Sequence, residues 1–235
     1  MMQRDGIVVV RSEGHSGMGN TIGPLSHSAS RRRFLVVAVA GGVTVLAGCD
    51  APGDNARRFN ATDITGVQWG RGFDLTDHTG HRRTLVDFKG KAVLLFFGYT
   101  NCPGPCPTAL AEMAQVVKQV GADRVQGLFV TVDPERDTPE KLAGYVPAFH
   151  PSLLGLRGSP EQTAQAAKEF KIHFQAQKAD KGSHSGHGGG EVSYMVDHST
   201  GIFIFDKQGR ARLYVRASDR SVDAIIHDVR LLLKQ

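Results

Sequence analysis

Residues 92–117 read AVLLFFGYTNCPGPCPTALAEMAQVV, and this stretch decides the fold. Its first six residues form a continuous apolar run of strand length, which is typical of a strand buried on both faces of a sheet. Pro107 is predicted to open a helix, because apolar residues then recur at helical spacing until Gly121 supplies a stop. A buried strand that leads through a short loop into a helix indicates a layered α/β domain.

The rest of the chain continues this alternation of strands and helices. Helices are expected to begin at Thr138-Pro139 and at the capping-box sequence 159–162, and a last helix is expected at 222–233. An N-terminal β-hairpin is predicted from residues 73–75 and 83–85, which flank a turn-rich sequence. Further strands are predicted at residues 125–132, 153–156, 192–196, 202–205 and 211–215. This order favours a thioredoxin-like fold with a central mixed sheet flanked by helices.

The charge distribution excludes one class of function. The 235-residue chain carries a formal charge of +5, but residues 1–48 contain five arginines and two acidic residues, so the remainder is nearly balanced at +2. The sequence has no basic stripe with interleaved aromatic residues, and nucleic acid is therefore not an expected partner.

Residues 1–48 are interpreted as a signal peptide. The sequence SRRRFL (30–35) resembles a twin-arginine export signal, and the apolar run 34–47 is shorter than the ~20 residues of a membrane-spanning helix. The run ends in LAGC (46–49), which resembles a bacterial lipobox with Cys49 as the lipidated residue. These signals predict a protein exported and lipid-anchored to the outer face of the bacterial cytoplasmic membrane. An uncleaved membrane anchor is the alternative.

Two further segments are predicted to be irregular. Residues 49–61 are polar and contain Pro and Gly, so they are interpreted as a flexible tether to a folded domain of residues 62–235. Residues 181–190, KGSHSGHGGG, are predicted to form a glycine-rich loop. His184 and His187 in this loop could gather a metal ion, but a solvated loop is the favoured interpretation.

Cys102 and Cys106 follow the buried strand and are separated by three residues. Their position places both sulfurs at the rim of the sheet, where open α/β sheets have their functional sites. Cys106 lies beside the predicted helix N-terminus, so the pKa of its thiol is expected to fall below about 8.5. Two soft thiolates suit Cu(I), although a simple disulfide in an oxidising compartment is an open alternative.

His198 is the best candidate for a third ligand. It lies in a short loop between two predicted strands, near the same rim. A neutral imidazole can complete a Cys₂His site for Cu(I) and also serves Cu(II). A solvated or hydrogen-bonded histidine is the alternative. His78 and His81 in the hairpin could gather a metal ion like His184 and His187, but a solvated loop is again the favoured interpretation.

Three motifs together resemble the Sco/SenC family of copper-binding assembly factors of cytochrome c oxidase. They are FFGYTNCPGPCPTAL (96–110), FVTVDPERDTPEKL (129–142) and YMVDHSTGIFIFDKQGR (194–210), and the resemblance covers residues 62–235. It implies a thioredoxin-like fold that binds one copper ion through Cys102, Cys106 and His198. It also implies delivery of copper to the binuclear centre of oxidase subunit II, with another copper chaperone as a candidate donor.

Asp133 and Asp137 lie in the second motif. The resemblance suggests that they act near the site or at the partner surface. Turn chemistry is an equal alternative, because Asp133-Pro134 ends a predicted strand and Asp137 precedes a helix start.

Two enzymatic functions compete with a metallochaperone, which breaks no substrate bond. In a thiol-disulfide oxidoreductase that keeps oxidase cysteines reduced, Cys102 would attack and Cys106 would resolve. Three intervening residues, and the lack of an X-Pro sequence beside His198, disfavour this function. A peroxidase would need Thr or Ser three residues before its cysteine, where this chain has Tyr99 or Pro103. The sequence therefore favours a protein that is not an enzyme.

Overall fold

The apolar run at the start of residues 92–117 forms the centre of the observed sheet. In the computed structural model it is β4 (Ala92–Gly98), and all seven of its residues are buried. β4 pairs in parallel with β5 (Val125–Thr131) on one side and antiparallel with β9 (Ile202–Phe205) on the other. The central sheet is therefore mixed, as predicted.

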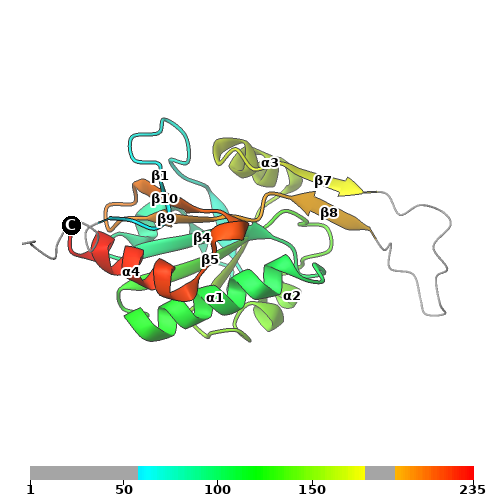
Figure 1. Cartoon of the computed structure of the whole chain (residues 1–235). Coiled ribbons are helices and arrows are strands. Elements are labelled where there is room, and N and C mark those ends of the chain that lie inside the picture. The colour runs from blue at the N-terminus through cyan, green and yellow to red at the C-terminus, as the bar shows by residue number, and fades with distance from the viewer. Residues whose placement is uncertain (1–57, 178–193) are drawn as a thin grey trace, which may run out of the picture. The chain divides into compact units, whose positions relative to one another are not determined.

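The structure describes residues 58–177 and 194–235, and within them eight strands form this sheet in the order β1-β10-β9-β4-β5-β6-β2-β3. A second sheet has two strands, β7 (Phe174–Gln177) and β8 (Met195–His198), which project from the body of the domain (Figure 1). The remaining strands are β1 (Thr62–Asp63), β2 (Leu75–Asp77), β3 (Arg82–Arg83), β6 (Leu154–Arg157) and β10 (Ala211–Val215).

Helices bury both faces of β4. α1 (Pro105–Val120) and α4 (Val222–Leu233) pack against each other on one face (Figure 1). On the other face Phe170, at the end of α3 (Pro160–Glu169), places its ring centroid 5.3 Å from that of Phe97. The core therefore lies on both sides of the central strands, which explains why their sequence is apolar without alternation.

Helix starts follow the predicted capping signals with one correction. α2 (Pro139–Tyr145) begins after Thr138, whose side chain accepts a hydrogen bond from a first-turn N–H, and α3 begins with the predicted capping box of Ser159. α1 begins two residues earlier than predicted, at Pro105. A proline is tolerated there because the first-turn N–H groups have no partner within the helix. Cys106 consequently lies inside the first turn of α1.

The predicted strand before His198 is β8, and His198 is its last residue rather than a loop residue. β8 does not pair with β9 but with β7, and Phe174 lies opposite His198. The strand β7 was not predicted, because its sequence FQAQ is short and three of its four residues are exposed. An alternation of apolar and polar residues over only four positions is too short to predict a strand with certainty.

The predicted N-terminal hairpin is confirmed as β2 and β3. The turn is held by Asp77, whose buried carboxylate accepts the backbone N–H groups of Thr79 and His81 and the guanidinium of Arg83. Burial by itself would raise the pKa of Asp77, but these hydrogen bonds outweigh it and lower the pKa to about 2. Gly80 adopts a φ of 91°, which glycine permits at little cost.

Several predictions fall outside the described residues: the signal peptide, Cys49, most of the tether and the glycine-rich loop with His184 and His187. The described end of the tether is held in place, because the backbone N–H groups of Asn60 and Ala61 donate to Asp228 in α4. Asn60 and Ala61, which the prediction assigned to the flexible tether, are therefore fixed to α4. No helix in the described part of the chain is long and apolar enough to cross a membrane.

Asp77→Asn is expected to lower the free energy of unfolding by about 2 kcal/mol near pH 7, because the folded state holds the carboxylate ion more tightly than the unfolded chain does. The lowered pKa means that this stabilisation is complete above the unfolded pKa near 3.8 and is lost as the pH falls toward 2. Urea unfolding at several pH values measures the difference between the two proteins.

Asp74→Asn is the matched control, because it removes an exposed carboxylate from the same hairpin. Its effect should be much smaller, since an exposed ion pair is largely screened by solvent. A gap between the native protein and Asp77→Asn that is equally large near pH 7 and near pH 2 would contradict the role given to Asp77.

Candidate metal centre

The two cysteines lie where β4 leads into α1. Cys102 is in the connecting loop with only 7% of its surface exposed, and Cys106 is completely buried in the first turn of α1. Both are free thiols. Gly98 makes this packing possible, because a Cβ at the end of β4 would lie 2.8 Å from the Cys106 sulfur. The glycine therefore lets the strand and the sulfur approach each other closely.

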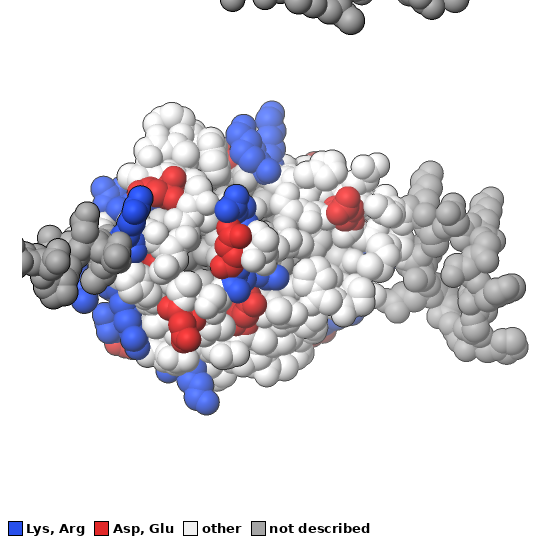
Figure 2. All heavy atoms as spheres, in the orientation of Figure 1, with Lys and Arg blue, Asp and Glu red and all other residues white. Residues whose placement is uncertain are grey.

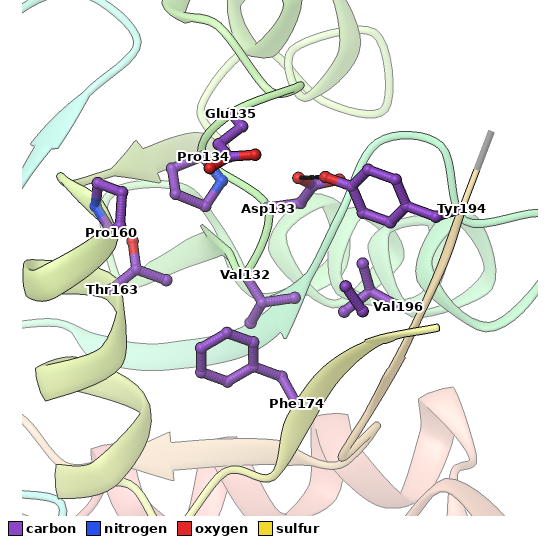
Figure 3. Close-up of a pocket in the computed structure, with 10 residues that line it drawn as sticks. Val132, Asp133, Pro134, Glu135, Pro160, Thr163, Phe174, Tyr194 and Val196 are labelled. Carbon is purple, nitrogen blue, oxygen red and sulfur yellow. Dashed lines mark hydrogen bonds between the residues drawn. The ribbon is translucent and has the colours of Figure 1, made fainter. Parts of the chain in front are cut away.

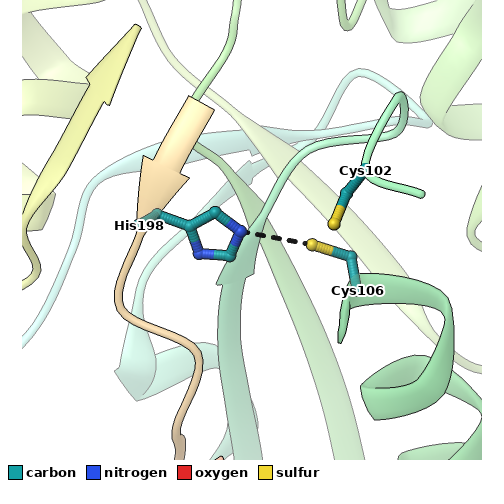
Figure 4. A group of neighbouring side chains, drawn as sticks. All are labelled: Cys102, Cys106 and His198. Carbon is teal, nitrogen blue, oxygen red and sulfur yellow. Dashed lines mark hydrogen bonds between the residues drawn. The ribbon is translucent and has the colours of Figure 1, made fainter. Parts of the chain in front are cut away.

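The imidazole of His198 reaches the cysteines from β8, 92 positions beyond Cys106 (Figure 4). Its Nε2 lies 3.4 Å from the Cys106 sulfur. The rings of Tyr99 and Phe96 stand edge-on to it, with centroids 5.7 and 6.2 Å away. The ring is thus confined between β8 and the end of β4.

A single hydrogen bond determines the tautomer of His198. Its Nδ1 lies 2.9 Å from the backbone carbonyl of Ser199, and a carbonyl can only accept. Nδ1 therefore carries the proton, and the lone pair of Nε2 faces the cysteines. Histidines that bind metals commonly donate their second ring N–H to a carbonyl in this way.

The sulfurs of Cys102 and Cys106 and one ring nitrogen of His198 all lie within 4.8 Å of one another. Among the described residues this is the one group of at least three His, Cys, Asp or Glu side chains that is arranged to hold a metal ion. Metal–nitrogen and metal–sulfur bonds of about 2.0–2.3 Å require ligand atoms about 4 Å apart. The three atoms therefore fit one metal ion after a small contraction, and they are the residues that the sequence singled out.

Burial changes the acid–base properties of the site. It raises the pKa of the Cys106 thiol far above its usual value, so the expectation of a lowered pKa was wrong. The sulfur is removed from water among apolar side chains, and this cost of charging exceeds the help from the helix N-terminus. Burial also lowers the pKa of His198, which favours the neutral ring that a metal needs.

Asp137 fixes the loop that carries Cys102. Its fully buried carboxylate accepts the backbone N–H of Thr100 at 3.0 Å, the hydroxyl of Thr100, and the hydroxyl of Thr131 at 2.6 Å. Burial raises the pKa of Asp137 despite these three hydrogen bonds. The loop of Cys102 is thereby tied to the end of β5.

Asp133 holds the histidine strand in a similar way. It accepts a hydrogen bond from the hydroxyl of Tyr194 at 2.7 Å, beside a cavity of about 200 Å³ (Figure 3). Arg136 pairs with Asp133, donates to the backbone carbonyl of Tyr194 at 2.8 Å, and stacks 3.6 Å from the centroid of its ring. Tyr194 immediately precedes β8, so this cluster fixes the strand that carries His198.

The two aspartates thus lie outside the group of metal-ligand atoms, and both contact the segments that carry that group. Turn chemistry also contributes, since the Asp137 N–H donates to the Asp133 carbonyl. His78 and His81 also lie outside the group of metal-ligand atoms: His78 accepts a hydrogen bond from the backbone N–H of Gly155 in β6, and His81 is hydrogen-bonded to Thr79 within the hairpin. The sequence analysis did not predict four residues that surround the site, which are Tyr99, Arg136, Tyr194 and Met195. Their only signal in the sequence was their place within the three motifs.

The site opens into a cavity of about 430 Å³. Cys102 and His198 line this cavity, whereas Cys106 does not and lies behind them. The remaining lining residues are Tyr99, Pro103, Pro105, Gln177, Met195, Val196, Asp197 and Thr200. A metal ion would therefore have a buried side at Cys106 and an open side at the cavity.

The chain is similar to known proteins over most of the described domain. The mitochondrial SCO2 homolog of Bos taurus is 39% identical over 209 residues, which are 85% of this chain and 74% of the relative. The copper-bound structure of Bradyrhizobium japonicum ScoI is 34% identical, with a TM-score of 0.58 over 68% of this chain and 96% of that one. Copper-bound yeast Sco1 is 30% identical, with a TM-score of 0.58 over 69% and 88%.

The sequence model of one family, described as SCO1/SenC, matches residues 62–234. This match contains all three motifs and every side chain of the metal-ligand group. The structural similarity to these Sco proteins, together with the observed mixed sheet and flanking helices, confirms the predicted thioredoxin-like fold. On this evidence the chain belongs to the SCO1/SenC family.

Proposed function

We propose that this chain is a copper metallochaperone that binds one copper ion through Cys102, Cys106 and His198. The observation that carries the proposal is the convergence of two sulfurs and one ring nitrogen within 4.8 Å. Copper-bound structures of two relatives support it. The proposed recipient is the binuclear copper centre of subunit II of cytochrome c oxidase, with a second copper chaperone as donor.

Copper binding in this site is coupled to proton release. Both cysteines must lose their protons to bind, and burial opposes a bare thiolate at Cys106. The charge of the metal ion offsets that cost. Two thiolates favour Cu(I), and the neutral imidazole of His198 makes the set suitable for Cu(II) as well.

The different burial of the three proposed ligands suggests the order in which their bonds to copper break during transfer. Cys102 and His198 line the open cavity, and Cys106 is buried behind them. A ligand from a partner protein can therefore replace His198 or Cys102 first, and the bond to Cys106 breaks last. Ligand exchange of this kind needs no free copper ion in solution.

Thiol-disulfide exchange is the second candidate function, because both cysteines are free and their sulfurs are close together. An attacking cysteine, however, should be accessible and largely ionised. The resolving cysteine must also attack as a thiolate, but Cys106 is completely buried and burial raises the pKa of its thiol. These features favour metal binding over catalysis of disulfide exchange.

The proposed place of action is the periplasmic side of the bacterial cytoplasmic membrane, where a lipid on Cys49 would anchor the chain. Mass spectrometry of the protein isolated from a bacterial membrane is expected to show a chain that begins at lipidated Cys49. Cys49→Ser is the control and should carry no lipid. Recovery of unmodified Cys49 with residues 1–48 still attached would exclude the lipoprotein.

His198→Ala is expected to weaken copper binding by more than about 100-fold, because even residues that only support metal ligands contribute tenfold to 100-fold. Competition with copper chelators under anaerobic conditions measures the affinity. The variant should still reduce a disulfide reagent, since both thiols remain. His81→Ala, which removes an exposed histidine, should bind copper like the native chain. Full copper affinity in His198→Ala would overturn the ligand assignment.

The pH dependence of Cu(II) binding should separate the imidazole from the thiols. Burial lowers the pKa of His198 below 6.5, so the ring stays neutral until the pH falls below that value. The affinity ratio between the native chain and His198→Ala should be constant from about pH 8 to about 6.5 and should shrink only at lower pH, where the ring becomes protonated. Thiol protonation affects both proteins and cancels in the ratio. A ratio that already shrinks between about pH 8 and about 6.5, or that equals one throughout, would contradict a neutral His198 ligand.

A further inference from the structure

Met195 is an exposed apolar residue beside the candidate metal site. Its side chain is 49% exposed, and Val86 is the one other large apolar side chain that is strongly exposed in the described part of the chain. It opens β8, three residues before His198. A single exposed apolar side chain is common on protein surfaces, so it is the position of Met195 beside Cys102 and His198 that points to a function.

The thioether of Met195 lies at the mouth of the metal site. Met195 lines the same cavity of about 430 Å³ as Cys102 and His198. Its sulfur accepts a hydrogen bond from the Tyr99 hydroxyl at 3.8 Å. The Tyr99 ring in turn stands edge-on to the His198 ring, with 5.7 Å between centroids. One tyrosine therefore contacts both the exposed sulfur and the imidazole.

The chemistry of this position suits Cu(I). A thioether is a soft ligand that selects Cu(I) over harder ions. It carries no proton, so it can bind without the proton release that the cysteines require. On the face shown in Figure 2, charged side chains lie over the middle and over the end away from the β7–β8 ribbon. Asp197 is the one Asp, Glu, Lys or Arg side chain among the residues that line the cavity of Met195, and its negative charge does not repel a cation.

We propose that Met195 is a transient Cu(I) ligand through which copper enters and leaves the site. This inference rests on the proposed function. During loading, a bond from Cu(I) to the Met195 sulfur forms as a bond to a donor ligand breaks. Bonds to Cys102, Cys106 and His198 then replace it, and the two thiol protons pass to solvent. Copper remains Cu(I) throughout, so no electron donor or acceptor is needed.

Met195→Leu tests the proposal, because leucine keeps a similar volume and removes only the sulfur. The full chain is loaded anaerobically with Cu(I), and its transfer to excess bathocuproine disulfonate is followed by stopped flow. The rate is expected to fall by about tenfold, whereas the equilibrium Cu(I) affinity changes by less than about threefold. Met113→Leu, which removes a buried thioether from the core, is the matched control and should transfer at the native rate.

A second measurement uses the native sequence and is independent of any substitution. Methionine methyl groups labelled with ¹³C are observed by NMR, and the Met195 signal is assigned from its loss in Met195→Leu. Substoichiometric Cu(I) should broaden or shift this signal, whereas the Met113 signal should stay in place. These changes would show the metal at the thioether.

Three outcomes would overturn the proposal. Equal transfer rates in the native chain and Met195→Leu would exclude a role for the sulfur, even if both proteins bind copper at equilibrium. An unchanged Met195 methyl signal during Cu(I) titration would do the same. A native chain that retains no copper at all would overturn the metallochaperone function together with this inference. The first two outcomes would instead overturn only the role of Met195.

Discussion

Two buried carboxylates hold the metal site together. A carboxylate without hydrogen bonds is very unfavourable inside a protein, so Asp133 and Asp137 constrain the backbone segments that donate to them. Asp137 binds the loop of Cys102 through Thr100, and Asp133 binds the segment before β8 through Tyr194. Both belong to the turn after β5, so one short segment positions ligands that are far apart in the sequence.

Arg136 completes this arrangement from the same turn. Its guanidinium pairs with Asp133, donates to the Tyr194 carbonyl and stacks on the Tyr194 ring. Planar stacking together with several directed hydrogen bonds is a combination that lysine cannot provide. The histidine strand β8 pairs only with β7 and lies outside the main sheet. This cluster therefore helps to connect β8 to the central fold, together with the contact between His198 and Cys106 and the buried side chain of Val196.

Burial raises the pKa of the Cys106 thiol and lowers the pKa of the His198 ring, and both shifts suit reversible metal binding. It disfavours charge at Cys106 and also at His198, which leaves a protonated thiol beside a neutral ring. The ring is ready to bind, whereas the thiol becomes a ligand only when a metal ion displaces its proton. From the cavity inward, the proposed ligands pass from the neutral thioether of Met195 to the buried thiolate of Cys106. This gradient would let copper bind weakly at the entrance and more tightly inside.

Most of the fold follows from the sequence by itself. The apolar run of β4, the helix-starting signals at Thr138 and Ser159, and the turn around Asp77 are local patterns, and each formed close to where it was predicted. The strand β7 did not follow, because it has only four residues and three of them are exposed, so its short alternation cannot be distinguished from a loop. The motifs also pointed to Cys102, Cys106 and His198 as one group, and the structure brings these three side chains together.

Only the tertiary structure could decide how these residues act together. The contact between Cys106 and His198 joins positions 92 residues apart, and it depends on the pairing of β8 with β7 and on the contacts of Asp133. The pKa of Cys106 went against the expectation from its helix position, because burial is a property of the packed domain and cannot be read from neighbouring residues. Sequence determines which donor atoms are present, whereas packing determines the distances between them and their exposure to water, and those quantities set their affinity for a metal ion.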